Sequence, residues 1–384
     1  MFEKQLAIIS MDSYLISAAF SHQKMEDVII EKKEREQSVA VGDIYIAKVK
    51  NVVPNIQAAF VEIQKDYMCY LPLKKEELSA VKQGMEFPVQ IVKPAVKSKQ
   101  PVCSRKIELA GMYAVITTEN LSKNISKKIT NLKERQRFEN LLETFSNEEY
   151  GIIIRTTAQN VADKVILEEC HTLLQQMKEL QNNAPYRTCF TKMVGAEREY
   201  VKYIQNCGTR YFDRIVTDVE EVYEDLKRVP QFQEESIVYY QDSYSLDKLL
   251  GIQNKLKKCQ KKHVWLKSGG SLVIELTEAL TVIDVNTEKA MEGKRDKEKT
   301  FFKINKEAAL EAACQMRLRN LSGIILIDFI DMEDKNHIDE LLELLRQEVA
   351  KDSVPTKVID MTALGLVELT RKKVRKPLHE WMKD

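Results

Sequence analysis

The chain has no cysteine pair of the kind that holds a zinc ion or marks a disulfide framework. Seven cysteines are scattered over 384 residues, and none belongs to a C-x-x-C motif. We therefore expect a reducing compartment, the cytoplasm, and no zinc. No uncharged apolar run approaches the roughly 18 residues that a membrane span needs. The N-terminal MFEKQLAIIS also lacks the basic and apolar parts of a signal peptide, so export is not expected either.

An excess of charge of one sign is also missing. The formal net charge is +1, so whole-chain charge does not indicate nucleic-acid binding and any basic footprint must be local. No low-complexity segment occurs, which argues against a pure scaffold. The hydrophobic fraction of 44% and the charged fraction of 30% are typical of a soluble globular protein. The length predicts two or three domains.

The most informative stretch covers residues 268–332, where two apolar segments each end in an acid. TVIDVN ends around Asp284 and IILIDFIDM reaches Asp328, and both runs are typical of buried strands. Residues 298–320 between them carry apolar side chains at helical spacing. Strand, helix and strand predict a right-handed parallel crossover, which places both strand ends at one sheet edge. Asp284 and Asp328 should therefore lie side by side, with Asn286 on the same face as Asp284.

Two carboxylates and an amide oxygen at a strand edge suit a hard cation. Mg²⁺ takes one or two carboxylates, keeps several waters and leaves the remaining positions to substrate phosphate. A metal held in this way can activate water and neutralise charge on a phosphodiester. For either acid alone, capping of the next turn explains the residue equally well. The paired placement favours a metal site.

These residues resemble those of the ribonuclease E/G family. The similarity lies in SGGSLVIELTEALTVIDVN, in the run from Arg317 to Gly323, and in IDFIDM, and it extends more weakly over nearly the whole chain. The resemblance implies that Asp284 and Asp328 bind Mg²⁺ and that Asn286 assists, whereas Asp331 is not carried over as a ligand. It implies a Mg²⁺-dependent, single-strand-specific endoribonuclease of RNA processing and decay. Such an enzyme acts on rRNA precursors and mRNA and leaves 3′-hydroxyl and 5′-phosphate ends.

Residues 41–106 contain four or five short strand signals separated by turns, which fits an OB-fold barrel. Such barrels bind single strands by stacking bases on exposed aromatic rings. Phe60 and Tyr70 are the candidate platforms, and Lys99 lies in a basic loop. A strand aromatic is more often part of the core. The family resemblance favours the RNA-binding interpretation, because it implies aromatic residues at these positions and a lysine in the later loop.

Arg155 and Thr156 follow an apolar strand signal and precede helical spacing over residues 160–180. An arginine fork, a hydroxyl and free amides there could face an anion. The resemblance implies that this pair holds the 5′-monophosphate of RNA, although an arginine salt-bridged at a strand end is the commoner arrangement. TAQN and SKNISKK stand where the family usually has glycines, so we expect a weaker preference for 5′-monophosphate RNA.

The predicted fold class is α/β, in a multidomain α+β arrangement. The N-terminal residues read as antiparallel strands, and the resemblance joins them to a later segment. The implied layout is an RNase H-like subdomain (1–38 and 196–262), an inserted OB-fold RNA-binding barrel (39–108), a 5′-sensor subdomain (109–195) and a DNase I-like catalytic domain (263–384).

Two basic clusters and two other functions remain open. KLKKCQKKH before the catalytic domain is interpreted as a solvated helix end, with an RNA contact as the less favoured alternative. The run from Arg371 to Lys376 is interpreted as a phosphate contact, with a solvated helix end as the alternative. A non-catalytic RNA-binding protein of the same fold is the main alternative function, and a phosphoesterase of small nucleotides is the second. The family's C-P-x-C zinc motif does not occur, so we expect a short, ribonuclease G-type member that forms a homodimer without zinc.

Overall fold

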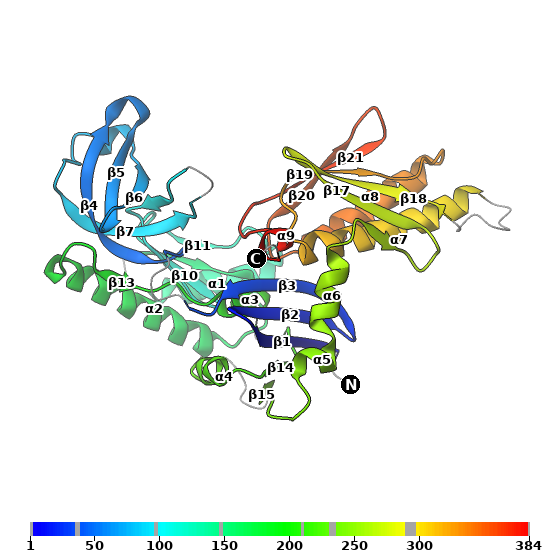
Figure 1. The fold of residues 1–384 in the computed structure, drawn as a ribbon. Helices are drawn as coiled ribbons and strands as arrows, with labels where there is room; N and C mark the ends of the chain where they lie inside the picture. Colours follow the sequence, from blue (N-terminus) through cyan, green and yellow to red (C-terminus); the bar gives the residue numbers. More distant parts are fainter. Residues whose placement is uncertain are drawn as a thin grey trace. The chain divides into compact units, whose positions relative to one another are not determined.

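The computed structural model describes residues 3–34, 39–95, 99–145, 149–208, 211–229, 236–288 and 297–382. The chain is a mixed α/β protein with two compact units (Figure 1). The first unit combines residues 1–33 with 209–384, and the second comprises residues 34–208. Within the described ranges, no helix has the length and apolar character needed to cross a membrane.

A five-stranded sheet opens the first unit. Strands β1 (Lys4–Met11), β2 (Tyr14–Ser21) and β3 (Lys24–Lys32) form two antiparallel hairpins, which confirms the predicted N-terminal strands. β14 (Arg214–Thr217) and β15 (Ile237–Tyr239) extend the sheet in parallel beside β1. The predicted pairing of the N-terminal strands with a later segment is therefore present.

Helices cover this sheet and connect it to the next. α4 (Glu220–Lys227) lies between β14 and β15 along the chain, and α5 (Leu246–Leu250) and α6 (Ile252–Cys259) follow. Leu246, Ile252 and Leu256 of α5 and α6 share one apolar core with β1, β2 and β3. Helices and strands thus alternate along the chain from α4 to α6.

The second sheet of this unit carries the paired acids. Its six strands, in spatial order, are β16 (His263–Trp265), β17 (Ser271–Leu276), β18 (Leu280–Asn286), β19 (Gly323–Asp328), β21 (Leu366–Arg371) and β20 (Thr356–Met361). Only the β18–β19 pair is parallel, and the other four pairings are antiparallel.

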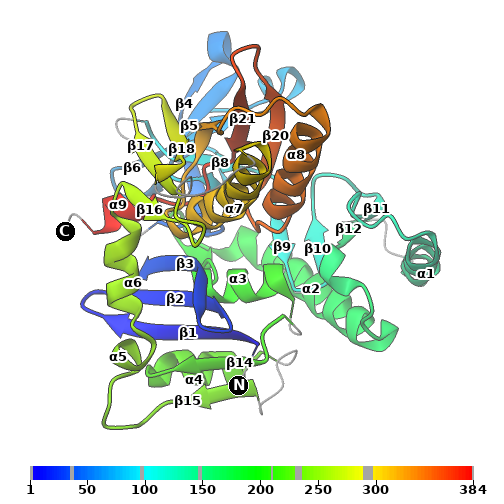
Figure 2. The ribbon, with the colours of Figure 1, turned by 90° about the vertical axis from the view of Figure 1, so that its right-hand side faces the viewer.

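Two helices pack on one face of this sheet (Figure 2). α7 (Lys297–Leu318) is the predicted crossover helix between β18 and β19, and α8 (Lys335–Ala350) packs beside it. Side chains at alternate positions of β18 are buried in this core, and those between them are only partly buried. The predicted burial of these strands therefore applies to one face, because helices cover a single face of the sheet. The other face carries Asp284 and Asp328.

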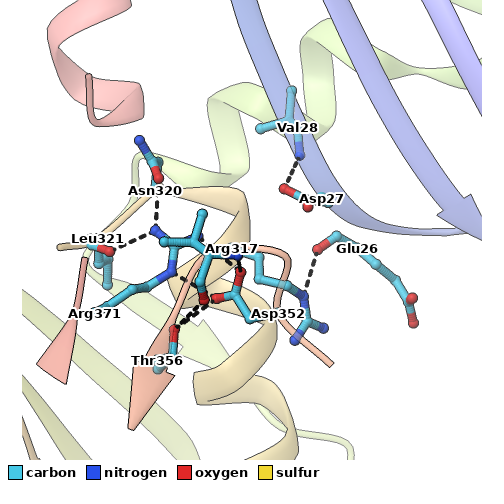
Figure 3. Close-up of polar contacts among 10 residues, drawn as sticks. Glu26, Asp27, Val28, Arg317, Asn320, Leu321, Asp352, Thr356 and Arg371 are labelled. Atoms are coloured by element: carbon cyan, nitrogen blue, oxygen red, sulfur yellow. Dashed lines mark hydrogen bonds and ion pairs between the residues drawn. The ribbon is translucent and has the colours of Figure 1, made fainter. Parts of the chain in front are cut away.

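The C-terminal basic run begins inside the protein. Arg371 ends β21 with 3% of its surface exposed, and its guanidinium forms an ion pair with Asp352 at 2.7 Å. It also donates to Asn320 Oδ1 and to the Leu321 carbonyl, as Figure 3 shows. The phosphate-contact interpretation is therefore wrong for Arg371, because its donors are used within the core. A short helix, α9 (Leu378–Trp381), follows the run.

The second unit begins with the predicted barrel. β4 (Ile44–Val53), β5 (Ala58–Gln64), β6 (Tyr67–Pro72), β8 (Val102–Ser104) and β7 (Glu86–Lys93) pair in this order, and β7 pairs back with β4. Five strands thus close into a barrel consistent with an OB-fold. Its core contains Tyr45, Val61 and Cys69. β13 (Lys192–Val194) adds to the outside of β4.

The rest of the second unit is a small sheet with helices. Its strands, in spatial order, are β11 (Lys123–Ile125), β12 (Gly151–Ile154), β10 (Ala114–Thr117) and β9 (Glu108–Ala110). The helices are α1 (Leu132–Glu143), α2 (Asp163–Asn183) and α3 (Glu199–Cys207). α2 starts three residues later than the predicted position 160, because Asn160 has a left-handed φ of 60° that a helix cannot contain.

Candidate active site and RNA-binding surfaces

Asp284 and Asp328 occupy directly paired positions on the parallel strands β18 and β19. Neighbouring strands are about 4.8 Å apart, so the two backbones hold these carboxylates side by side. Their strand neighbours Ile283, Val285 and Ile327 point into the core, so both acids point to the open face of the sheet. The predicted convergence of the two acids is confirmed as a placement.

Asn286 lies on the same face as Asp284. Its side-chain Nδ2 donates a hydrogen bond of 2.7 Å to Asp284 Oδ2. This bond fixes the orientation of the Asp284 carboxylate and does not use the amide oxygen of Asn286. Asn286 is therefore placed to orient one acid and to offer a neutral oxygen beside it.

The local charge at this edge is negative. Partial loss of hydration and the nearby carboxylates of Asp284 and Asp331 raise the pKa of Asp328 above its usual range. A cation bound at this edge would relieve the repulsion between neighbouring carboxylates. Among the described residues, no group of three or more His, Cys, Asp or Glu side chains forms a metal cluster. Two carboxylates with an amide oxygen still fit Mg²⁺, which retains several waters as ligands.

The sequence did not indicate two α7 residues that hold the segment after Asp328. Asn305 is fully buried; its Nδ2 donates to the Ile330 carbonyl at 2.7 Å, and its Oδ1 accepts from the Ile330 amide at 3.1 Å. Glu298 accepts from the amides of Glu333 and Asp334. The available signal was Asn305 itself, a polar residue on the apolar stripe of the predicted helix.

Phe60 and Tyr70 face each other across β5 and β6. They are paired in register, and their ring centroids are 5.9 Å apart in an edge-to-face contact. Both rings are half-buried and lie outside the barrel core, to which their strand neighbours Val61 and Cys69 belong. The Tyr70 amide donates to the Pro101 carbonyl at 2.8 Å, which brings the segment with the exposed Lys99 alongside β6.

Arg155 and Thr156 lie directly after β12 and precede the long helix, as predicted. Thr156 is the first residue of a three-residue 3-10 helix, η3 (Thr156–Ala158), and α2 begins only at Asp163. The Arg155 guanidinium donates to the Gly111 carbonyl and to Asn206 Oδ1. Burial lowers the pKa of Arg155, and the nearby carboxylates of Glu169 and Glu197 oppose this shift.

A buried carboxylate beside this arginine was not predicted. Glu169 of α2 accepts hydrogen bonds from the amides of Met112, Tyr113 and Ala114 at 2.6 to 3.0 Å. These three amides form an anion-binding turn that an internal carboxylate already uses. A phosphate at Arg155 would therefore depend on the guanidinium and on Thr156, because Glu169 occupies these amide donors.

Comparison with known proteins gives the chain a family. The model of the Ribonuclease E/G family matches residues 108–374. Ribonuclease G of Haemophilus influenzae is 32% identical over 385 residues, which cover 94% of this chain and 77% of that protein. Ribonuclease G of Salmonella typhimurium is 30% identical, with 91% and 76% covered.

This chain belongs to the ribonuclease E/G family. Ribonuclease E of a Nostoc species is also 30% identical, over 98% of this chain and 57% of that protein. Membership makes the chain an endoribonuclease, an enzyme that hydrolyses phosphodiester bonds. The segment matched by the ribonuclease E/G model contains Asp284, Asp328, Arg155 and Thr156, and it excludes the barrel residues Phe60, Tyr70 and Lys99.

Proposed function

We propose that this ribonuclease E/G member is a Mg²⁺-dependent, single-strand-specific endoribonuclease of RNA processing and decay. Its substrates are rRNA precursors and mRNA in the cytoplasm, and its products carry 3′-hydroxyl and 5′-phosphate ends. The observation that carries the proposal is the register of β18 and β19, which pairs Asp284 with Asp328 on an open sheet face. An internal phosphodiester of an RNA strand can reach such a face without an RNA end having to pass through a channel.

The residues at this edge of the sheet would have different roles. Asp284 and Asp328 would hold Mg²⁺, and Asn286 would keep the Asp284 carboxylate oriented through its 2.7 Å hydrogen bond. The bound metal would supply an activated water and neutralise charge on the phosphodiester. Asn305 would set the path of the chain immediately after Asp328 through its two bonds to Ile330.

RNA binding is assigned to the second unit. Phe60 and Tyr70 would stack bases, because their rings lie outside the barrel core and offer faces that every base can use. Lys99 would contact the backbone of the same strand. Arg155 and Thr156 would bind a 5′-monophosphate, with the guanidinium as the main contact.

The finer subdomain layout is part of the same proposal. The sheet of β1–β3 with β14 and β15 would be RNase H-like, and the sheet of β16–β21 with α7 and α8 would be a DNase I-like catalytic domain. The barrel and the 5′-sensor subdomain would be inserted between the two parts of the RNase H-like subdomain. We propose a symmetric homodimer of this chain as the assembly.

The test is cleavage of a 5′-labelled, AU-rich single-stranded RNA with mapping of the new ends. Asp284→Asn and Asp328→Asn should each lower the rate by several orders of magnitude while RNA binding persists, because the loss falls on the transition state. Asn286→Ala should lose less, because Asn286 orients and carries no charge. Asp331→Asn is the matched control and should retain most of the activity.

Three results separate the possibilities. EDTA should stop cleavage and Mg²⁺ should restore it, with 3′-hydroxyl and 5′-phosphate ends on the fragments. RNA binding without metal-dependent cleavage would support the non-catalytic alternative. Full activity of Asp284→Asn would contradict the assigned site.

A further inference from the structure

The open face of the second sheet carries an exposed tryptophan near the paired acids. Trp265 ends β16, and 66% of its surface is accessible to solvent. Tryptophan is normally well buried, because its large ring system gains much from leaving water. Trp265 does not gain this stabilisation in the folded chain, because its ring stays exposed. The ring is therefore available to a ligand.

Sheet register places this ring on the face that carries the acids. Trp265 pairs with Ser271, and Ser271 pairs with Asn286. Val264 packs against the core of α7 and α8, so its strand neighbour Trp265 points the opposite way. Two strand spacings separate Trp265 from Asn286, which is about 10 Å. Asn286 is in turn hydrogen-bonded to Asp284.

Ser271 separates Trp265 from Asn286 in the sheet register. Ser271 is small and fully buried, and its hydroxyl donates to Glu288 Oε1 at 3.3 Å. The Ser271 side chain is therefore covered, and the exposed ring of Trp265 is the group that offers a face to a ligand.

Exposed lysines lie a few residues before Trp265 along the chain. Lys257 and Lys258 in the last turn of α6, and Lys261 just beyond it, are exposed and precede β16 directly. Lys262 is already paired with Glu275 at 3.0 Å. Lysines beside an exposed aromatic ring are the combination that proteins use to bind single-stranded nucleic acid. A second copy of this chain fits less well, because a symmetric contact at Trp265 would bring the same lysines together.

We infer that Trp265 stacks a base of the RNA strand close to the cleaved phosphodiester and that the lysine segment 257–261 contacts the adjoining phosphates. This second stacking site lies on the catalytic sheet itself and is separate from Phe60 and Tyr70. The inference rests on the proposed function in taking single-stranded RNA as the ligand and in placing the cleaved phosphodiester at Asp284 and Asp328.

The chain contains two tryptophans, so fluorescence can isolate this ring. Trp381 packs edge-to-face on Tyr14 at 5.5 Å, and Trp381→Phe keeps a ring there. In a Trp381→Phe, Asp284→Asn chain, a ten-nucleotide single-stranded RNA should quench Trp265 emission in step with binding measured by anisotropy. Moving one abasic nucleotide along the strand should weaken the quench at a single position.

Affinity provides the second readout. Trp265→Ala should weaken RNA binding by about 5- to 150-fold, the range expected for one lost base stack. Trp265→Phe should recover much of it. Leu310→Ala is the matched control, because Leu310 is an exposed apolar residue on α7, which packs against the other face. This variant should bind RNA like the unmutated chain.

The outcomes distinguish this inference from the nuclease proposal. RNA that binds without quenching Trp265, or unchanged affinity of Trp265→Ala, overturns the inference even if cleavage is normal. Quenching that follows protein concentration and not RNA would assign the ring to a contact between copies and would also overturn it. Saturable quenching of Trp265 by RNA would support the inference even if the unmutated chain proves unable to cleave RNA.

Discussion

Two buried aspartates in the first unit lie near the same arginines but in different bonding environments. Asp352 is paired with the Arg371 guanidinium, whereas Asp27 of β3 accepts a hydrogen bond from the neighbouring Val28 amide (Figure 3). Burial raises the pKa of Asp27 above its usual value of 3.8, and the positive charges of Arg375, Arg317 and Arg371 oppose the shift. Folding therefore raises the affinity of the Asp27 carboxylate for a proton relative to the unfolded chain.

This difference predicts opposite effects of the same substitution. Because the folded pKa of Asp27 is raised, its contribution to stability is complete below the unfolded pKa and is lost as the pH rises through the folded pKa. The Asp27→Asn variant should therefore have a higher melting temperature than the unmutated chain at pH 7.5. The difference between the two melting temperatures should disappear as the pH falls toward 4. Asp352→Asn should lower the free energy of unfolding by about 3–5 kcal/mol, because it leaves the Arg371 guanidinium buried without its partner carboxylate.

Thermal unfolding followed by circular dichroism across this pH range measures both variants. A pH-independent difference between Asp27→Asn and the unmutated chain would show that the carboxylate does not titrate between these limits. If the Asp352→Asn variant is as stable as the unmutated chain, the remaining hydrogen bonds of Arg371 are enough to satisfy its guanidinium.

At the scale of elements, the barrel offers a test of stacking. Phe60→Ala or Tyr70→Ala should weaken RNA binding by about 1–3 kcal/mol for each stacked base lost. Both variants should remain folded, because the rings lie outside the barrel core. Fluorescence anisotropy with a labelled oligonucleotide measures the affinity, and thermal unfolding measures the fold.

Tyr45 is the matched control for the barrel, because it is an aromatic residue of the same barrel with only 1% of its surface exposed. Tyr45→Ala should destabilise the unit by about 3–5 kcal/mol. If Phe60→Ala or Tyr70→Ala unfolds the barrel as Tyr45→Ala does, that ring is structural and the stacking assignment fails.

The turn after β12 predicts how the 5′ end is read. Arg155→Ala should erase any preference for 5′-monophosphate RNA over 5′-hydroxyl RNA and leave cleavage of the hydroxyl substrate unchanged. We expect the preference itself to be small, because Glu169 occupies the amides of residues 112–114. Initial rates on two RNAs that differ only at the 5′ end measure it.

Asn206→Ala is the control for the 5′ end. It removes one internal partner of the guanidinium and keeps the charge of Arg155, so the preference should survive. Equal rates of the unmutated protein on both RNAs would mean that Arg155 and Thr156 only support the turn.

At the scale of the whole molecule, assembly without a zinc link is the testable point. We predict that the proposed homodimer closes through protein surface without zinc, so its native mass should be the same before and after EDTA treatment. Native mass spectrometry at several protein concentrations gives this result directly. A chelator that splits the assembly would contradict it and would indicate a metal between chains.

Predicting the fold from sequence worked best where local pattern and connectivity agree. The short strand signals separated by turns over residues 41–106 indicated a barrel, and the apolar helix between TVIDVN and IILIDFIDM indicated a crossover. Because parallel crossovers place strand ends together, the pairing of Asp284 with Asp328 followed from the sequence. Local signals failed at Asn160, where a left-handed residue delays the start of α2.

The sequence by itself therefore determined the family, the two acids and the elements that carry them, because these depend on contiguous motifs and short periodic patterns. Only the tertiary structure decided which polar groups hold or surround the sites. Asn305 reaches Ile330, Glu169 reaches the amides of residues 112–114, and Arg371 turns inward to Asp352. Trp265 stays exposed because α7 and α8 cover the opposite face of its sheet. Each of these roles depends on a partner or a covering element distant in sequence, and a linear pattern cannot place such a partner in space.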